Sequence, residues 1–431
     1  MILLQNALHR PTVRLLAIAS VMAVFVPTAQ AQQSSGNNMH WLRQQIEVLP
    51  EIHAAQQKRD ASLSQADSYS RALYNPELGT GYEREGEQDN YQVSISQKID
   101  WWDQKGSREQ QAQFLRIQAE QDYRFNYQTI LKNALLAFVN WQAAKQRYEL
   151  ALDQEQQLDQ LIKLVKSRSA NGDLGQIDVE LTLLSLSQTL ADTAQAVAAY
   201  HSAENRVRQW MPNWQPTTPV LNAAFWSNTQ QFLTTDTSNP QQSDKELLQA
   251  LPELRIAKAE WKIQQAQAET VRRGNKAEPT IGITAGQNGN TDVVGLNLSI
   301  PLNIRNNYSA ETRSAERMAL ETEARFRAQY RKLRFDLKGA FGAWQSYNLQ
   351  FTQWQSLVKG RIESSGDLLE KQWRSGDLST TNYLIALNQR AESLLSGIEL
   401  EKQTRIALKN LMLQSGRLID LPPVQHDFSI E

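Results

Sequence analysis

The sequence predicts a mainly α-helical protein with a small β part, built from two tandem repeats of helix, β-hairpin, very long helix and helix. Three observations predict this fold class. Short motifs recur in the same order about 200 residues apart, long segments contain no proline or glycine, and two pairs of short segments alternate apolar and polar residues. The alternation has the period of a strand, and the long uninterrupted segments are typical of helical rods.

The composition limits the classes of function. The 431 residues include 45 Lys and Arg against 46 Asp and Glu, so the net charge of −1 does not suit a polycation that binds nucleic acid. The chain has no cysteine, which excludes disulfides, thiolate metal sites and cysteine-linked lipids. Hydrophobic residues make up 41% of the chain, which excludes a bundle of apolar transmembrane helices. The chain is therefore expected to be polar, rich in helix and elongated.

Residues 1–31 have the pattern of a secretory signal peptide. Arg10 and Arg14 precede an apolar run over 15–26, and Ala29 and Ala31 form a cleavage site of the A-x-A type. The run is shorter than the roughly 20 residues that span a bilayer, although an uncleaved anchor is the alternative. We expect an exported bacterial protein whose mature N-terminus carries no lipid, because no cysteine is present.

The duplication is read from four pairs of motifs. The members of each pair are separated by 202 to 204 residues and occur in the same order. So small a drift indicates a tandem duplication rather than a short-period solenoid. The paired segments are 49–52 with 251–254, 75–79 with 278–282, 93–96 with 296–299, and 171–174 with 375–378.

The expected organisation follows from these repeats. The first repeat covers 32–211, a connector covers 212–244, the second repeat covers 245–415 and a tail covers 416–431. The first helix of each repeat stops before a proline, and the longest helix, of about 65 residues, should form a rod of roughly 100 Å that ends at a glycine. The expected helices are 39–73, 107–171 and 176–210 in the first repeat, and 245–275, 307–375 and 379–413 in the second.

Two hairpins are expected, with strands at about 78–84 and 91–100 and at about 280–286 and 293–302. Strands of about ten residues match a tilted membrane strand, and aromatic residues mark both ends of the first hairpin. The alternative is two soluble hairpins, each packed on a helix. The residues expected to face lipid are Tyr91, Val93, Ile95, Ile99, Val294, Leu296, Leu298 and Ile300, and the expected aromatic girdle is Tyr82, Trp101 and Trp102.

Four strands are too few to enclose a membrane pore. The smallest spanning barrels have about eight strands, and an open sheet edge in lipid leaves backbone groups unpaired. If these strands cross a membrane, several chains must contribute, and three copies would supply about twelve strands. Pro301 cannot donate to a strand ladder, so we expect it to end the last strand.

The order of elements and the motifs over 39–415 resemble the TolC family of bacterial outer-membrane factors. The resemblance is carried by Asn75-Pro76-Glu77-Leu78, by Leu298-Ser299-Ile300-Pro301-Leu302 and by the two Gly-Asp-Leu motifs. Within the family, the segments 97–108 and 295–313 are similar to the CzcC-like and CusC-like members that serve heavy-metal exporters.

This resemblance implies a homotrimer in the outer membrane, in which a β-barrel of twelve strands continues into a periplasmic α-barrel. It also implies docking to a periplasmic adaptor protein and, through it, to an inner-membrane pump of the resistance–nodulation–division type. The docking tips implied for this chain are Gly172, Asp173, Leu174, Gly376, Asp377 and Leu378. The alternative is that the glycines serve only the turns.

The family often carries an aspartate ring six residues beyond the tip glycine of the second repeat. That place holds Asn382 in this chain, which departs from the family pattern. In the first repeat the corresponding place is Asp178, with Glu180 nearby, and these carboxylates could favour cations in a narrow pore. The alternative places them on an outward, solvated face. Asp178, Glu180 and Asn382 are thus the candidates for a gate at the tip.

The sequence contains no catalytic motif that would indicate an enzyme. Metalloprotease, nucleophile-elbow and Walker patterns are absent, and the histidines and methionines are scattered. We therefore expect no cofactor and no resident metal. We expect a passive duct that discriminates little between the molecules passing through it. Heavy-metal cations are the expected cargo, with drugs or other small molecules as the alternative. The alternative from another class is a soluble periplasmic coiled-coil scaffold or adaptor.

Overall fold

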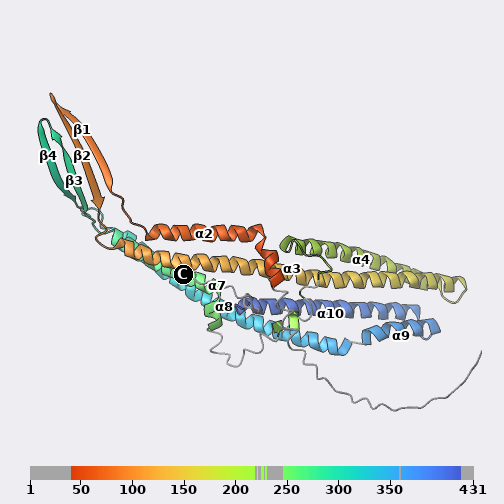
Figure 1. Ribbon diagram of the computed structural model, residues 1–431. Coiled ribbons are helices and arrows are strands. Elements are labelled where there is room, and N and C mark those ends of the chain that lie inside the picture. The colour runs from red at the N-terminus through yellow and green to blue at the C-terminus, as the bar shows by residue number, and fades with distance from the viewer. Residues whose placement is uncertain are drawn as a thin grey trace, which may run out of the picture.

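The structure is a computed structural model that describes residues 40–218, 221, 225–227, 229–230, 246–358 and 361–418. The chain is a long rod with a β-sheet at one end and two helical tips at the other (Figure 1). The prediction of a mainly helical chain with a small β part is confirmed, and the structure joins the four strands into one antiparallel sheet. The predicted signal peptide, most of the predicted connector and most of the predicted tail lie outside the described residues.

The first helix of each repeat is interrupted just before a proline, after helical residues 40–47 in the first repeat and 246–250 in the second. A short helix over 40–47 ends in a turn, and α2 then runs over Pro50–Ser70, whereas one helix was expected over 39–73. In the second repeat α7 runs over Pro252–Gly274. Leu49 and Leu251 both have extended backbone angles, because a residue before proline avoids the α region and proline is well tolerated in the first turn. The Leu-Pro-Glu motif that marks the duplication is therefore also a helix start.

The longest helix differs between the repeats. In the first, α3 runs unbroken over Gln104–Ala170, 67 residues or roughly 100 Å, and α4 returns over Gln176–Trp210. In the second, the single helix expected over 307–375 is wrong, because α8 ends at Val358 and α9 covers Arg361–Ser375. Residues 359–360, between these two helices, lie outside the described residues. The last helix, α10, covers Thr380–Gln414.

The four strands form one antiparallel sheet in the order β1-β2-β3-β4. The strands are β1 Glu77–Glu85, β2 Gln88–Lys98, β3 Thr280–Asn288 and β4 Thr291–Ser299. The central pairing joins the repeats, with Val93 opposite Ala285. Ile99 and Ile300 lie just beyond their strands, so their assignment to the strands is wrong. The Ile99 N–H donates to the Pro279 carbonyl (2.9 Å) outside the ladder, and Pro301 offers no N–H to extend β4.

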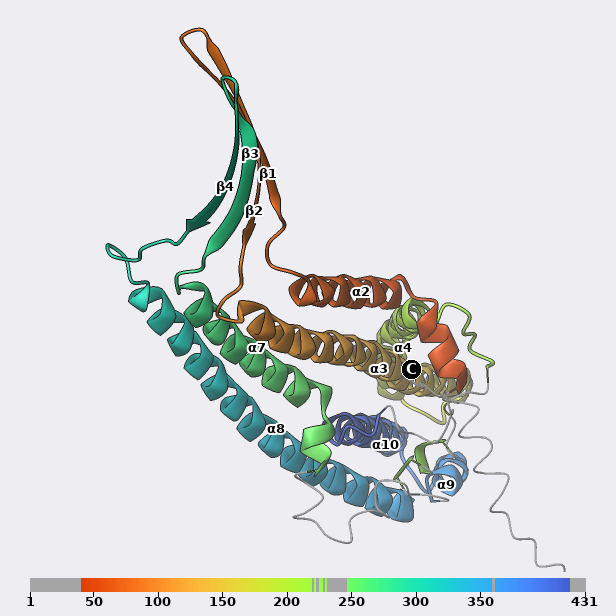
Figure 2. The same ribbon diagram turned by 60° about the vertical axis from the view of Figure 1, so that its left-hand side comes forward.

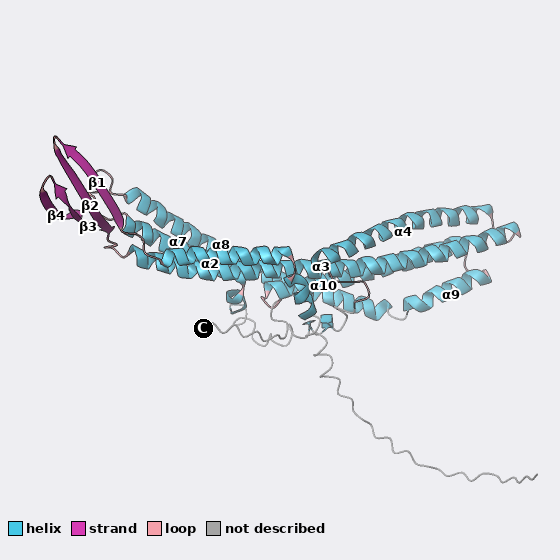
Figure 3. Cartoon of the chain, turned by 45° about the horizontal axis from the view of Figure 1, so that its top comes forward, coloured by secondary structure: helices cyan, strands magenta, loops and turns pink. Residues whose placement is uncertain are grey.

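The helices form a curved wall. On the sheet side of the rod, α2 packs on α3, α3 on α7 and α7 on α8; towards the tips α3 packs on α4 and α10, and α10 on α8 (Figures 2 and 3). Midway along the rod, an aromatic core joins the repeats. Trp141 packs edge-on against Trp214 with 4.6 Å between ring centroids, and Leu408 and Met412 of α10 belong to the same buried cluster.

A buried lysine lies beside this core and is expected to destabilise the fold at neutral pH. Lys409 is 3% exposed, and its burial together with the positive charge of Lys132 lowers its pKa to about 8. Because the pKa is lowered in the folded state, the penalty for protonation is complete below pH 8 and disappears as the pH approaches the unfolded value of 10.5.

We therefore expect Lys409→Met to raise the free energy of unfolding at pH 7 by about 2 to 3 kcal/mol. Thermal unfolding followed by circular dichroism measures the change, and the gain should shrink between pH 8 and 10.5. Lys163→Met is the control, because this side chain is 73% exposed and should have little effect. A Lys409→Met protein that melts no higher than the unaltered protein at pH 7 contradicts the prediction.

Candidate functional site: the sheet and the helical tips

One face of the sheet is apolar and exposed. Because side chains alternate along a strand, the antiparallel register aligns apolar residues of all four strands into rows. One row consists of Leu78, Ile95, Ile283 and Leu296. We call this surface the apolar face; its large exposed members are Leu78, Tyr82, Tyr91, Val93, Ile95, Ile281, Ile283, Val294, Leu296 and Leu298, each at least 50% exposed.

The opposite face, the polar face, carries small and uncharged side chains in its central rows. One row is Gly79, Ser94, Thr284 and Gly295. The next row towards the helices sets Gly282 beneath Asn297, so close that a Cβ at Gly282 would lie 2.1 Å from the Asn297 Oδ1. Glycine at this position lets the polar face stay tightly packed. The sheet thus separates an apolar surface from a hydrophilic one, as a barrel strand does between lipid and lumen.

The sheet stands clear of the helices (Figure 2). Within the described residues no helix packs along either of its faces, and the outer edges of β1 and β4 pair with no further strand. The soluble alternative, two hairpins each covered by a helix, is therefore wrong for the described chain. Exposed edges of this length are templates for pairing with another chain.

Aromatic residues lie at both ends of the sheet. At the far end, the rings of Tyr82 and Tyr91 are 5.2 Å apart, and the Tyr82 hydroxyl donates to Asp89 (2.8 Å). At the helical end, Trp101 is 68% exposed. The Trp102 side chain is held by a hydrogen bond, in which its indole N–H donates to the Ala277 carbonyl (2.8 Å). The structure therefore gives Trp102 a contact between repeats that the sequence did not indicate.

The two tips are helix ends closed by glycine. Gly172 has φ +80° and Gly376 has φ +87°, the left-handed region that favours glycine after a helix. The Asp173 N–H donates back to the Arg168 carbonyl (2.9 Å), and the Leu378 N–H to that of Gln372 (3.1 Å). A Cβ at either glycine would meet nothing within 4 Å, so both turns present open backbone at the end of the rod.

A second buried cluster, the tip core, holds these turns together. The Trp373 ring stacks on Tyr383 (5.3 Å between centroids), its indole N–H donates to the Thr380 hydroxyl (3.2 Å), and Arg168 of the first repeat lies over it. Burial raises the pKa of Tyr383 above the ordinary value of 10.0. The members of the tip core are Leu158, Leu161, Ile162, Val165, Val179, Trp373, Tyr383 and Leu384.

The tip core was only partly visible in the sequence. The apolar periodicity of 158–165 indicated its α3 side, but Trp373 gave no signal of its own because its partners lie on other helices. Leu174 and Leu378 of the predicted docking motifs pack against this core and are half-buried. Asp173 and Asp377 are exposed, and Asp377 accepts a hydrogen bond from Ser375 (2.7 Å).

The gate candidates lie in the first turns of two helices. Asp178 is half-buried in the first turn of α4, where a carboxylate also stabilises the helix dipole. Glu180 is exposed and accepts a hydrogen bond from Gln176 (3.1 Å). Asn382 is exposed in the first turn of α10, where its backbone N–H donates to the Ser379 hydroxyl (3.2 Å). Their exposure leaves Glu180 and Asn382 free to meet solvent or another chain.

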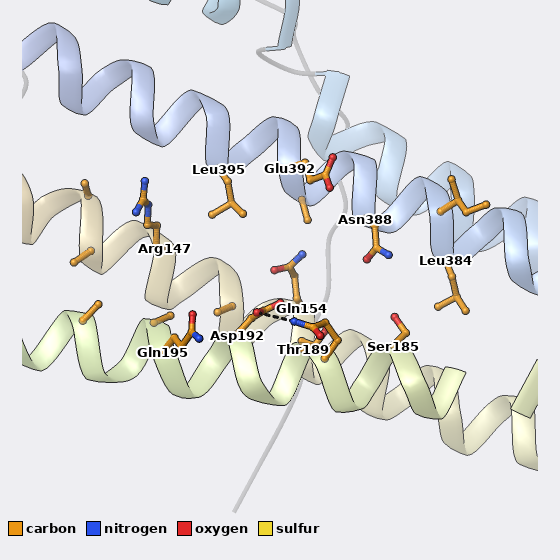
Figure 4. Close-up of a pocket in the computed structure, with 18 of the residues that line it drawn as sticks. Arg147, Gln154, Ser185, Thr189, Asp192, Gln195, Leu384, Asn388, Glu392 and Leu395 are labelled. Atoms are coloured by element: carbon orange, nitrogen blue, oxygen red, sulfur yellow. Dashed lines mark hydrogen bonds between the residues drawn. The ribbon is translucent and has the colours of Figure 1, made fainter. Parts of the chain in front are cut away.

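A groove of about 860 Å³ runs between the α3–α4 pair and α10 (Figure 4). Its lining combines small side chains such as Ala151 and Ala391 with amides such as Gln154 and Asn388, and the charged Arg147 and Glu392 also line it. Across the whole described part of the chain, no group of three His, Asp or Glu side chains could hold a metal ion. The described helices also include none that is long and apolar enough to cross a bilayer.

Comparison of the chain with protein-family models identifies a family that covers most of it. A family model described as outer membrane efflux protein matches residues 41–211 and 245–417. A comparison with curated protein sequences found no match.

Solved structures share the fold at low identity. A structure of CusC is similar with a TM-score of 0.73 and 14% identity, over 88% of this chain and 92% of that chain. The outer-membrane channel OprN gives 0.74 and 14%, over 90% and 91%. The MtrE outer membrane channel of Neisseria gonorrhoeae, in its open state, gives 0.70 and 14%, over 90% and 88%.

Proposed function

This chain belongs to the outer membrane efflux protein family, and from this premise we propose that it is the exit duct of a tripartite efflux system. The observation that carries the proposal is the sheet with one exposed apolar face, one polar face and two open edges. Such a sheet is stable in a bilayer when the apolar face meets lipid and every edge is paired. Membership of the outer membrane efflux protein family supports the same function, a channel of the outer membrane.

The open edges favour an assembly of three copies. Four strands cannot close a pore, and three chains would give about twelve strands, which is within the range of known barrels. The helical wall also has two open edges. On the sheet side of the rod the helices pack in the order α2, α3, α7 and α8, so α2 and α8 are its outer helices. We propose that these edges meet in a trimer whose helices form a periplasmic tunnel of about 100 Å.

The tips are the proposed contact with an adaptor protein in the periplasm. The α3–α4 and α9–α10 turns lie at the far end of the rod, where a partner coming from the inner membrane would arrive (Figure 1), and their glycines Gly172 and Gly376 present open backbone. The adaptor in turn would connect the duct to an inner-membrane pump of the resistance–nodulation–division type, as the family resemblance implies. The duct needs no chemistry of its own, because the pump supplies the energy.

We propose heavy-metal cations as the cargo. The proposal rests on the likeness of segments 97–108 and 295–313 to heavy-metal members of the family. The structures of CusC and OprN are about equally similar to this chain, so the similarity of fold does not decide the cargo. A wide aqueous duct selects weakly, and cargo choice is expected to lie with the pump.

The proposal is tested in two steps. The purified mature chain should behave as a detergent-dependent trimer from the outer membrane, and a water-soluble monomer would reject the duct and favour a periplasmic scaffold. Deletion of the gene should then sensitise cells to soft and borderline metal cations. Sensitivity to amphiphilic drugs alone would keep the duct and replace its cargo.

The carboxylate at Asp178 is proposed to favour cations at the narrow end of the tunnel. Single-channel recordings should show that Asp178→Ala lowers the ratio of cation to anion permeability, because a ring of negative charge is removed. Asp159→Ala is the control, since that carboxylate lies on the same half of the rod but is exposed and paired with Lys163 (2.6 Å). An unaltered permeability ratio in Asp178→Ala would dispose of the charged gate.

A further inference from the structure

The orientation of the sheet is not set by apolar packing. Among the described residues no strand packs along a helix, and the sheet joins the helices through four connections only (Figure 1). These are the links α2–β1, β2–α3, α7–β3 and β4–α8. A sheet hinged on four free links would swing, because extended chain has little stiffness of its own. Contacts among the links must therefore hold it.

The link from α7 to β3 is the centre of these contacts. The Asn303 side chain, from the β4–α8 link, donates to the Asn275 carbonyl (2.9 Å). Trp102, from the β2–α3 link, donates to the Ala277 carbonyl (2.8 Å). The next residue of the same link is Glu278, which contacts the α2–β1 link and the end of β2. All three other links thus bond to residues 275–278.

Glu278 is a buried carboxylate shared by three segments. Its side chain is 1% exposed. The Tyr74 hydroxyl, from the α2–β1 link, donates to Oε2 (2.6 Å), and the Lys98 ammonium at the end of β2 lies 3.0 Å from the same oxygen. The Lys98 Nζ also lies 4.4 Å from the centroid of the Tyr74 ring. Burial and the hydrogen bond to Glu278 raise the pKa of Tyr74, so the phenol keeps the proton that it donates.

Burial of the Glu278 carboxylate costs folding free energy that an apolar side chain of similar size would not. The second oxygen of Glu278, Oε1, is buried and has no hydrogen-bond partner among the described residues. A buried carboxylate is expensive unless it is fully paired, and an apolar side chain of similar size often replaces such a pair without loss. What an apolar side chain cannot supply is direction, because hydrogen bonds and ion pairs fix angles that apolar contacts leave free.

We propose that Glu278 is a positioning residue that locks the sheet at a fixed angle to the helices within a single chain. The lock holds the free edges of β1 and β4 in the orientation in which they pair with neighbouring copies. The inference rests on the proposed function for the purpose of the lock, since it assumes that these edges pair between chains. The lock itself is a property of one chain and can be measured separately.

The lock is tested by a distance measurement between sheet and helix. The chain has no native cysteine, so a Val93→Cys, Gln113→Cys double variant carries spin labels on β2 and α3 alone. In detergent micelles, with labelled chains diluted among unlabelled ones, the distance distribution should be narrow, and Glu278→Ala should widen it about twofold as the sheet loosens. Glu77→Ala is the matched control, because this carboxylate is exposed at the start of β1 near the same joint. Equal widths for Glu278→Ala and Glu77→Ala would overturn the proposal.

Replacing one or both members of the Lys98–Glu278 pair distinguishes loss of the lock from misfolding. Lys98→Met leaves the Glu278 charge buried with one partner fewer, whereas Lys98→Met with Glu278→Met removes both charges. Both proteins should fold, and the double variant should regain thermal stability but keep the wide distribution. A double variant with a narrow distribution would show that shape alone sets the angle, and would overturn the proposal.

The assembly readout separates this inference from the proposed function. On electrophoresis without boiling, the yield of trimer should fall several-fold in Glu278→Ala and stay unchanged in Glu77→Ala. If the unaltered chain forms no trimer, the proposed function fails while the distance measurement still decides the lock. If trimer yield is equal in all variants, the lock has no role in assembly and the inference fails alone.

Discussion

Leu296→Arg is expected to abolish assembly of the chain in the outer membrane, whereas Asn297→Lys one residue away is tolerated. Leu296 is 81% exposed in the middle of β4 on the apolar face, and Asn297 points to the polar face. An arginine that faces lipid near the bilayer midplane costs about 2 to 4 kcal/mol. In a trimer the cost would occur three times.

The measurement is the amount of heat-modifiable trimer recovered from the outer-membrane fraction. The Asn297→Lys variant controls for added charge and for the loss of a native side chain on the same strand. Val294 lies two residues before Leu296 on the same apolar face, so Val294→Arg should have the same effect as Leu296→Arg. Normal trimer levels in Leu296→Arg would mean that the apolar face does not meet lipid, and the barrel would have to be abandoned.

The second large effect is expected at the tips. A variant with Gly172→Asn and Gly376→Asn should lose resistance to the exported compound while keeping its trimers. Asparagine adopts a left-handed conformation at low cost, so the turns survive, but its side chain occupies the open backbone surface of both tips. The resistance of cells and the trimer yield are measured on the same cultures.

A companion variant separates docking from turn formation. Leucine at both glycines adds a left-handed strain of about 1 to 2 kcal/mol at each position, so it disturbs the turn as well as the surface. If docking uses these glycines, the asparagine and leucine variants both lose resistance. If the leucine variant alone loses it, the glycines serve the turns and the docking surface lies elsewhere on the tips.

The apolar face shows how much of the sheet surface the alternation within single strands predicts. The alternation in β2 and β4 predicted Tyr91, Val93, Ile95, Val294, Leu296 and Leu298 as one surface, and the structure places them on one face. Leu78, Ile281 and Ile283 lie on the same face but were not singled out, although β1 and β3 carry the same alternation. Their rows became clear only when the register between strands was known.

The helices show where a local pattern fails. The glycine-free stretch of the first repeat predicted one rod, and α3 is one rod. In the second repeat, the glycines weakened the helical pattern but did not predict where the helix would end, and the structure has α8 ending at Val358 and α9 beginning at Arg361. Helix propensity differs by about 1 kcal/mol for a glycine, so packing decides the outcome.

The sequence by itself determined the duplication, the strand alternation, the glycine turns and the length of the rods, because each depends on residues that are near one another in the chain. The tertiary structure alone decided that β2 pairs with β3, that Trp373 joins the tips, and that Tyr74, Lys98 and Glu278 meet at one joint. These contacts bring together residues up to about 200 positions apart. Their partners are set by the geometry of the whole chain, which no periodicity of a short segment contains.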